Sequence, residues 1–150
     1  MKQKSRFCTA RRILIFWTLF IGLGAVAGAL AMLLDPSGKS MGMDAMLSYF
    51  QVLPFADVVF QDFTFSGWAL LIVNGLTNLT AAGLLLAKKH SGVVLGGVFG
   101  VTLMLWICIQ FYMFPPNFMS TTYFFFGLAQ AATGYAAWVF EKQEAFRVDI

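Results

Sequence analysis

Charged residues are scarce in this sequence, and long parts of it have none. Only 11% of its 150 residues are Asp, Glu, Lys or Arg, against about 25% in ordinary globular domains. Uncharged stretches of 22 to 25 residues cover residues 13–34, 63–87, 91–114 and 118–140. A soluble domain of this size cannot bury so much apolar surface, so an ordinary soluble fold is excluded.

Residue types that form catalytic and metal sites are also nearly missing. The sequence has one histidine, His90, and two cysteines, Cys8 and Cys108. No ionisable Asp, Glu, His, Lys or Arg lies within an uncharged stretch, so a proton relay lacks its usual parts. One His without a partner ligand forms no zinc site, and no phosphate-binding loop or nucleophile elbow occurs. We therefore expect no catalytic residue, no metal site and no enzyme activity, and the sequence requires no cofactor.

The uncharged stretches predict transmembrane helices. At about 1.5 Å rise per residue, each stretch can cross the roughly 30 Å hydrocarbon core of a bilayer. We therefore predict an all-α fold with a single domain over residues 1–150, an integral membrane four-helix bundle. The first stretch is longer than the apolar region of a cleavable signal peptide, so we expect it to be a span of the bundle.

Lys and Arg residues lie almost entirely on one side of the predicted bundle. Nine of the ten lie before the first span, between the second and third, or after the fourth: Lys2, Lys4, Arg6, Arg11, Arg12, Lys88, Lys89, Lys142 and Arg147. Because cytoplasmic loops carry such an excess, we predict cytoplasmic N and C termini in a multi-pass protein of a bacterial inner membrane. This bias accounts for most of the net charge of +3, so no nucleic-acid binding is expected.

The long connection over residues 35–62 predicts a short amphipathic helix in the first outer loop. Its apolar residues recur at spacings of three and four, which places them on one helix face: Met43, Met46, Leu47, Phe50 and Leu53. A segment this short and apolar either lies on the membrane surface or covers the outer mouth of the bundle. We favour the second arrangement, because Met and Phe side chains adapt to irregular packing.

Glycines at spacings of about four residues predict close packing between helices. In lipid, helix association depends on van der Waals contact, and small residues let two backbones approach. The glycines on these faces are Gly24, Gly28, Gly92, Gly96, Gly100, Gly127 and Gly134. Packing within one chain explains all of them, and formation of a homo-oligomer through one face is the alternative.

Uncharged polar residues lie near the middle of the second, third and fourth predicted spans, at Asn74, Thr102 and Gln130. In the second span, Asn74, Thr77 and Asn78 follow one helix stripe. This stripe must face inward, because an unsatisfied amide in hydrocarbon costs several kcal/mol. We therefore expect the polar groups of the three spans to meet at one depth.

Two interpretations of these polar residues stay open. They can hydrogen-bond one another and fix the helix register, at about 0.6 to 2 kcal/mol per bond. They can instead line a small cavity and bind the polar head of a ligand. The candidate ligand-binding residues are Asn74, Thr77, Asn78, Thr102 and Gln130 at the midplane, with Gln110, Asn117 and Tyr123 at the predicted outer mouth.

Part of the sequence resembles a known family. A surface segment "MLSYFQVLPF" followed by "GWALLIVNGLTNLTAAGLLLAKKHSGVVLGGVFGVTLMLW" resembles the DoxX-like group of small four-helix bacterial membrane proteins, over roughly Met43 to Trp106. The resemblance implies an accessory membrane subunit or a bundle that binds a small molecule. Members of that group commonly carry an acidic residue near the position of Asn74, and this departure argues against a redox or quinone role.

Three functional hypotheses follow. The first is a non-enzymatic membrane protein that binds an apolar small molecule, a lipid or a partner membrane protein through the neutral polar midplane. The second is a small oligomeric channel or transporter for a neutral solute, which the glycine faces favour. The third, implied by the resemblance, is a quinone-linked redox accessory subunit or a lipid-modifying enzyme.

Overall fold

The computed structural model describes residues 2–148, and it describes the side chains of residues 5–147. The side chains of Lys2 and Lys4, and residues 1 and 149–150 of the predicted domain, lie outside this part. The described residues form helices and no strand. The long elements are α1 (Lys2–Leu34), α3 (Thr64–Leu70) continued by a π-helix η3 (Leu71–Leu76) and α4 (Thr77–Leu86), α5 (His90–Met113) and α6 (Phe118–Val148).

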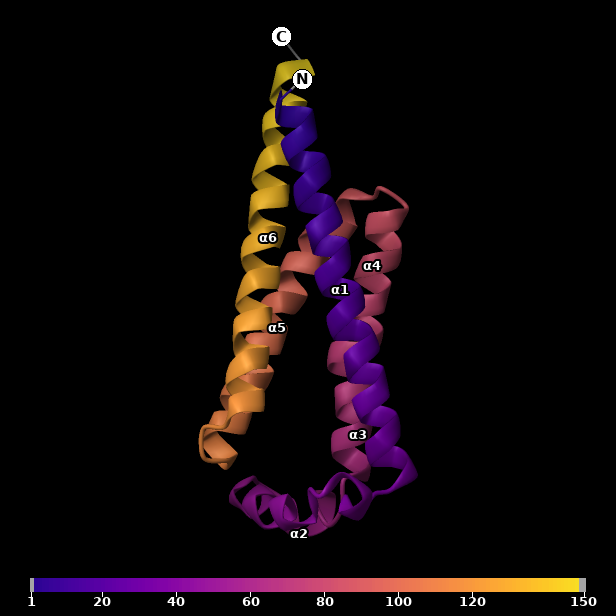
Figure 1. The fold of residues 1–150 in the computed structure, drawn as a ribbon, viewed down its shortest axis with the longest axis vertical. Helices are drawn as coiled ribbons and strands as arrows, with labels where there is room; N and C mark the ends of the chain where they lie inside the picture. Colours follow the sequence, from indigo (N-terminus) through magenta and orange to yellow (C-terminus); the bar gives the residue numbers. More distant parts are fainter. Residues whose placement is uncertain (1, 149–150) are drawn as a thin grey trace.

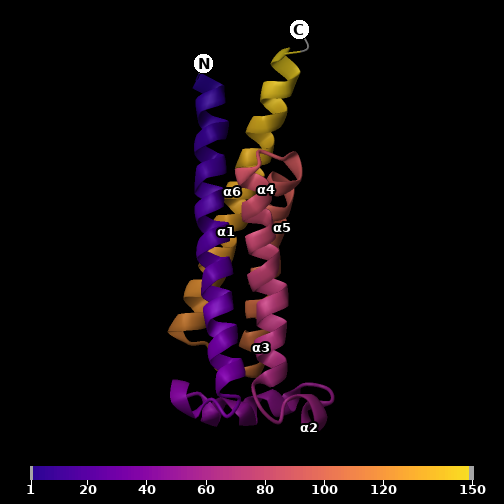
Figure 2. The same ribbon diagram turned by 90° about the vertical axis from the view of Figure 1, so that its right-hand side faces the viewer.

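The long helices run along one axis, and both ends of the chain lie at the same end of the molecule (Figures 1 and 2). We call this end the terminal end and the opposite one the loop end. Helices α1 and α6 extend past the turn between α4 and α5 at the terminal end (Figure 1). Helix α3 packs mainly on α1, whereas α5 and α6 pack mainly on each other. The two pairs approach each other toward the terminal end and diverge toward the loop end (Figure 1).

Within the described residues, three helices are long and apolar enough to cross a membrane. They cover Ser5–Leu34, Thr64–Leu86 and His90–Met113. The second and third match the predicted spans to within one residue at each end, whereas the first begins at Ser5 rather than at residue 13. Large apolar side chains such as Leu23, Leu105 and Ile109 are exposed on these helices, as expected where lipid covers the surface. The chain is therefore a helical membrane protein.

Helix α6 (31 residues) begins where the fourth predicted span begins but continues past residue 140 to Val148, and it is not among these three helices. Its middle carries Gln130, Thr133 and Tyr135, and its last turns carry charged residues from Glu141 onward. These residues lower its hydropathy even though residues 118–140 have no charge. Composition alone therefore does not mark α6 as a membrane span.

Glycines bring the backbones of α5 and α6 into direct contact. A Cβ atom placed on Gly100 would lie 2.5 Å from the backbone nitrogen of Ala131 and 2.8 Å from the backbone oxygen of Gly127. A Cβ on Gly134 would collide with the backbone of Gly97. Neither helix can accept a side chain at these points, so the predicted packing role of Gly100, Gly127 and Gly134 is confirmed.

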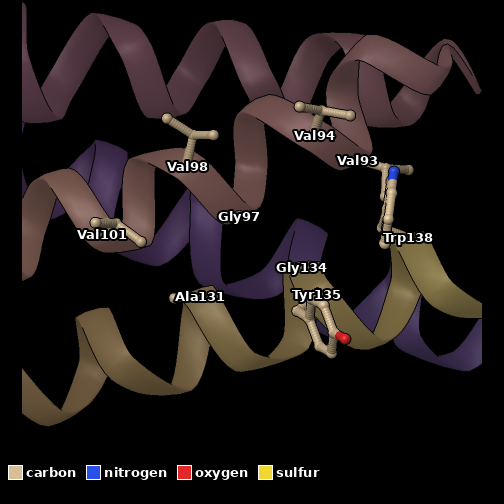
Figure 3. Close-up of a pocket in the computed structure, with 9 residues that line it drawn as sticks. All are labelled: Val93, Val94, Gly97, Val98, Val101, Ala131, Gly134, Tyr135 and Trp138. Carbon is tan, nitrogen blue, oxygen red and sulfur yellow. The ribbon is translucent and has the colours of Figure 1, made fainter.

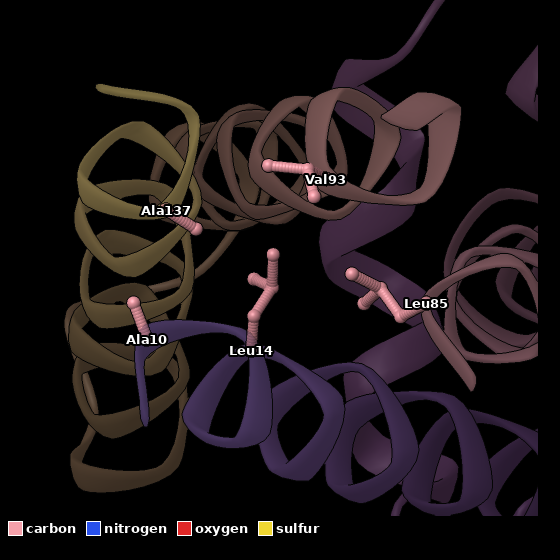
Figure 4. Close-up of a cluster of buried hydrophobic side chains, with 5 residues drawn as sticks. All are labelled: Ala10, Leu14, Leu85, Val93 and Ala137. Carbon is pink, nitrogen blue, oxygen red and sulfur yellow. The ribbon is translucent and has the colours of Figure 1, made fainter. Parts of the chain in front are cut away.

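The other glycines of α5 face different helices. A Cβ on Gly92 would lie 2.6 Å from the backbone nitrogen of Leu85 in α4, and one on Gly96 would lie 2.9 Å from the Leu14 side chain of α1. At the terminal end, Leu14 points between Leu85 and Val93, beside Ala10 and Ala137 (Figure 4). Helix α5 thus contacts α1, α4 and α6 through successive glycines.

The prediction that Gly24 and Gly28 form the close-packing face of α1 is wrong. The nearest atom to a Cβ on Gly24 would be the Tyr123 hydroxyl at 3.9 Å, and Gly28 has only an ordinary contact at 3.4 Å. The close contacts come from Gly22, where a Cβ would lie 3.0 Å from Leu79, and from Gly75, where it would lie 3.1 Å from Val26. Spacing alone misled here, because the partner helix supplies part of the small residues and sets which face of α1 is covered.

The loop end is closed by two 3₁₀ helices, η1 (Lys39–Met41) and η2 (Asp44–Val52), and a short helix α2 (Ala56–Val59). The predicted amphipathic helix is present, but it is wound as a 3₁₀ helix. Its Phe50 packs with Phe63, Met113 and Phe114, which joins the segment to the end of α5. The segment crosses the end of the bundle between α3 and α5 (Figure 1), as the prediction of a cap requires.

Asp35 ends α1 and organises the turn that follows. Its carboxylate accepts hydrogen bonds from the Ser37 hydroxyl at 2.6 Å and from the Ser40 backbone N–H at 2.8 Å. These bonds, with that of Ser37 the largest, lower the pKa of Asp35 from 3.8 to about 2. The carboxylate therefore stays charged, and the turn keeps its bonds, until the pH falls to about that value.

The α5–α6 contact predicts the effect of one added methyl group. We expect Gly100→Ala to lower the free energy of unfolding by about 1 to 3 kcal/mol, because the methyl group must displace backbone atoms. The measurement is denaturant unfolding in detergent micelles. Gly83→Ala is the matched control: nothing lies within 4 Å of a Cβ there, and Ala is favoured over Gly in a helix by about 1 kcal/mol. Equal stability of the two variants would contradict the close contact.

Candidate functional site

Buried amide side chains connect three helices in the interior. Gln130 of α6 donates Nε2–H bonds to Oδ1 of Asn78 in α4, at 2.8 Å, and to the backbone oxygen of Gly96 in α5, at 2.7 Å. Gln130 and Asn78 are both 0% exposed, and Asn74 is 1% exposed. We call Asn74, Asn78 and Gln130 the polar layer. Because buried amides need partners, this layer fixes how α4, α5 and α6 are aligned.

The sequence explains why these groups can meet. The stripe that begins at Asn74 and Asn78 continues with buried Ala81 and Leu85, so one face of α4 points into the bundle. On α5, the backbone oxygen of Gly96 accepts the second hydrogen bond of Gln130. The predicted inward stripe is confirmed. The sequence predicts that Gln130 meets Asn74 and Thr102. Its interhelical side-chain partner is instead Asn78, one turn beyond Asn74, and the side-chain amide of Asn74 has no hydrogen-bond partner in the protein.

Asn74 lies in a locally widened helix. Residues Leu71–Leu76 form a π-helix between α3 and α4, and the Asn74 backbone oxygen accepts a bond from Asn78 Nδ2 at 2.9 Å. Segments of π-helix are rare in proteins, and those that occur often lie at functional sites. Sequence periodicity does not reveal this turn, because an α-helix through the same residues has nearly the same apolar pattern.

Three buried polar atoms of the layer have no hydrogen-bond partner within the protein. They are Nδ2 and Oδ1 of Asn74 and Oε1 of Gln130. Each such atom costs about 1 to 3 kcal/mol, and native proteins usually satisfy buried polar groups with protein, water or ligand. The layer thus offers an uncharged donor and two acceptors that the fold itself does not use.

The expectation that Thr102 hydrogen-bonds within this layer is wrong. Thr102 is partly exposed, and its hydroxyl donates to the backbone oxygen of Val98 at 3.2 Å. Thr77 likewise donates to the backbone oxygen of Val73, at 2.6 Å. A threonine hydroxyl can be satisfied by the preceding turn of its own helix, so it does not require a partner on another helix.

The polar candidates at the loop end form a separate group. The Ser120 hydroxyl donates to Oε1 of Gln110 at 2.9 Å, and the Ser120 backbone N–H donates to Oδ1 of Asn117 at 2.9 Å. Tyr123 is half-buried, and its ring packs against that of Phe126. These bonds close the hairpin between α5 and α6, so Gln110 and Asn117 serve the turn.

Sequence reasoning missed Thr18 of α1. Its side chain is 0% exposed, and its hydroxyl donates to the backbone oxygens of Leu14 and Ile15, each at 3.0 Å. Leu14 itself packs on Gly96, next to the polar layer. The signal that could have found it is simple, since Thr18 is the one hydroxyl or amide residue in residues 13–34.

Charged side chains gather at the terminal end. His90, the first residue of α5, pairs through Nδ1 with Oε2 of Glu141 in α6 at 2.6 Å. Lys142 Nζ lies 4.2 Å from the centroid of the Trp138 ring. Among the described residues, no three His, Cys, Asp or Glu side chains come together in a way that fits a metal ion.

Comparisons of this chain with protein-family models, curated proteins and solved structures found no significant match. The geometry of the polar layer therefore carries the functional inference.

The polar layer predicts a measurable coupling between Asn78 and Gln130. In a double-mutant cycle with Asn78→Ala and Gln130→Ala, we expect a coupling energy of about 0.6 to 1.7 kcal/mol, the range of interhelical hydrogen bonds in membranes. Unfolding of the four proteins in bicelles gives this value. The control cycle pairs Thr102→Ala with Gln130→Ala, for which we expect coupling near zero. Larger coupling in the control cycle than in the test cycle would refute this description of the layer.

Proposed function

We propose that this chain is a four-span protein of a bacterial cytoplasmic membrane that binds an apolar molecule with an uncharged polar head, and that Asn74 and Gln130 recognise the head. The proposal rests on one observation: the Asn74 amide and Oε1 of Gln130 are buried without a hydrogen-bond partner in the protein. An apolar molecule enters from lipid, and its head supplies the missing hydrogen bonds.

The close contact between α5 and α6 supports the fourth span. Helix α5 is apolar enough to cross the membrane, and only residues 114–117 separate it from α6. A connection this short requires α6 to return beside α5 through the same layer. The lower hydropathy of α6 favours its insertion into lipid less strongly than that of the other helices. Its association with the bundle is stabilised instead by the backbone contacts at Gly100 and Gly134 and by the hydrogen bonds of Gln130.

The distribution of charge supports the orientation. Nine of the ten Lys and Arg residues belong to the two chain ends or to the connection between the second and third spans, which are the segments at the terminal end. Only Lys39 belongs to a connection at the loop end. The terminal end is accordingly the cytoplasmic side. The segment from Lys39 to Val59 then covers the bundle on the outer side of the membrane.

The chemistry of the layer supports an uncharged ligand. No Asp, Glu, His, Lys or Arg lies in the charge-free stretches, so a charged head would be buried without a counter-ion, at high cost. A hydroxyl group fits the unused atoms well, because it can donate to an amide oxygen and accept from the Asn74 Nδ2 group. The π-helix around Asn74 is consistent with such a site.

A place among the DoxX-like proteins is part of this proposal. The resemblance implies an accessory membrane subunit or a bundle that binds a small molecule. An uncharged residue at Asn74, where that group commonly carries an acid, favours binding of a neutral molecule over redox chemistry.

The proposed orientation predicts one-sided labelling of a natural thiol. Cys8 lies in α1 before the charge-free stretch that begins at residue 13, whereas Cys108 is exposed on α5 within the stretch 91–114. In intact cells, we expect Cys8 to react with a membrane-impermeant maleimide only after permeabilisation. A Ser40→Cys variant in a Cys8→Ser background is the opposite control and should react in intact cells. Reaction of Cys8 in intact cells would overturn the orientation.

The binding proposal predicts that Asn74→Leu abolishes ligand binding without lowering the stability of the fold. Native mass spectrometry of the protein released from nanodiscs should detect a bound small molecule that Asn74→Leu and Gln130→Leu lack. Because the Asn74 side-chain amide has no hydrogen-bond partner in the protein, we expect Asn74→Leu to melt at an equal or higher temperature after the ligand is removed.

Thr102→Val is the matched control, since it also removes one polar group but lies outside the layer. This variant should keep the bound molecule. A mass spectrum of the wild-type protein without an adduct, or an adduct that survives Asn74→Leu and Gln130→Leu, would refute the proposal.

A further inference from the structure

A groove of about 390 Å³ runs along the outer surface where α5 meets α6. Its α5 wall consists mainly of valines, from Val93 to Val101, and its α6 wall includes Ala131, Tyr135 and Trp138. Figure 3 shows the valine side chains along α5 and the Trp138 ring between the two helices at one end. The groove is a feature separate from the polar layer, because none of its lining residues belongs to that layer.

The contact between the two helices produces the groove. Gly97 and Gly134 lie at its floor, and a Cβ atom on Gly97 would lie 3.3 Å from the Gly134 Cα atom. Two backbones that approach this closely leave a depression bounded by the larger side chains on either side. A Cβ on Gly134 would collide with Gly97, so the depression cannot be filled by a residue at that position.

The length of the groove, and its position along α5, match one leaflet of a bilayer. From Val93 to Val101, the rise of α5 is about 12 Å, at about 1.5 Å per residue. Half of the roughly 30 Å hydrocarbon core is about 15 Å. The groove begins one turn after His90, the first residue of α5, and so extends from the terminal-side interface toward the midplane. This is the depth that an acyl chain of the terminal-side leaflet occupies.

Positive charge lies at the interfacial end of the groove. Trp138 lines this end, and Lys142 Nζ is 4.2 Å from the centroid of its ring. Lys89 immediately precedes α5. The nearby carboxylate of Glu141 is paired with His90, which reduces its repulsion of an anion. The exposed Tyr135 ring lies tilted beside Trp138, and both residue types favour the membrane interface.

We propose that this groove binds an anionic glycerophospholipid of the leaflet at the terminal end. One acyl chain lies along Val94, Val98 and Val101, and the phosphate lies at Lys142 above Trp138. Basic residues beside a gap between transmembrane helices recognise lipid headgroups in this way. The charge distinguishes this occupant from a zwitterionic lipid, and the leaflet-length groove distinguishes it from a soluble anion.

The test is a titration of the detergent-purified full chain with phosphatidylglycerol or phosphatidylcholine of identical acyl chains, followed by native mass spectrometry. We expect the first phosphatidylglycerol to bind about tenfold more tightly than phosphatidylcholine. Lys142→Gln should weaken phosphatidylglycerol binding about fivefold and leave phosphatidylcholine unchanged, since it removes one charge near the headgroup. Lys39→Gln, the same change at the loop end, should alter neither.

A second pair of variants tests the groove itself. Val98→Phe fills it and should weaken binding of both lipids, whereas Leu105→Phe adds the same ring at an exposed position of α5 outside the groove and should weaken neither. Asn74→Leu should leave lipid binding unchanged, which separates this site from the polar layer. Equal binding of the two lipids, equal effects of Lys142→Gln and Lys39→Gln, or a dimer of the chain that Val98→Phe dissociates would overturn the proposal.

Discussion

The amide of Gln130 is the interaction on which the arrangement of the helices depends. From α6 it reaches Asn78 on α4 and a backbone oxygen on α5, and it is completely buried. Such bonds contribute little energy in lipid, but a shift of any one helix leaves buried amides without partners. The contact also requires that α5 and α6 lie backbone to backbone, which the glycines at 100, 127 and 134 allow. Polar bonds and glycine packing are therefore parts of one constraint.

The sequence predicted the helices well because a charge-free stretch as long as a bilayer is thick rarely forms anything but a membrane helix. It also predicted the inward stripe of Asn74 and Asn78, since a buried amide can face only other helices. Prediction from the sequence failed where two different structures are compatible with the same residue pattern. Thr102 bonds to its own helix instead of a neighbour, and Gly24 has the right spacing but faces no backbone. The choice between such solutions depends on the partner helix, which a single sequence does not identify.

The proposed binding role and the stability of the fold place different demands on the same few residues. Asn78 and one end of Gln130 are used by the fold, whereas Asn74 and the other end of Gln130 are buried without use. If the layer served only helix packing, an apolar residue in place of Asn74 would increase the stability of the fold. This division between used and unused atoms within one layer is the observation that favours the proposed binding role over a purely structural hydrogen-bond network.

The π-helix at Leu71–Leu76 also has a mechanical consequence. A wide turn accommodates an extra residue, and one residue corresponds to about 100° of rotation in an α-helix. Helix α3 presents Gly67 to α1, and α4 presents Asn78 to Gln130 of α6. Residues 64–86 consequently form two α-helical halves joined by a wider turn, and a change in the width of this turn at Asn74 would rotate one half relative to the other.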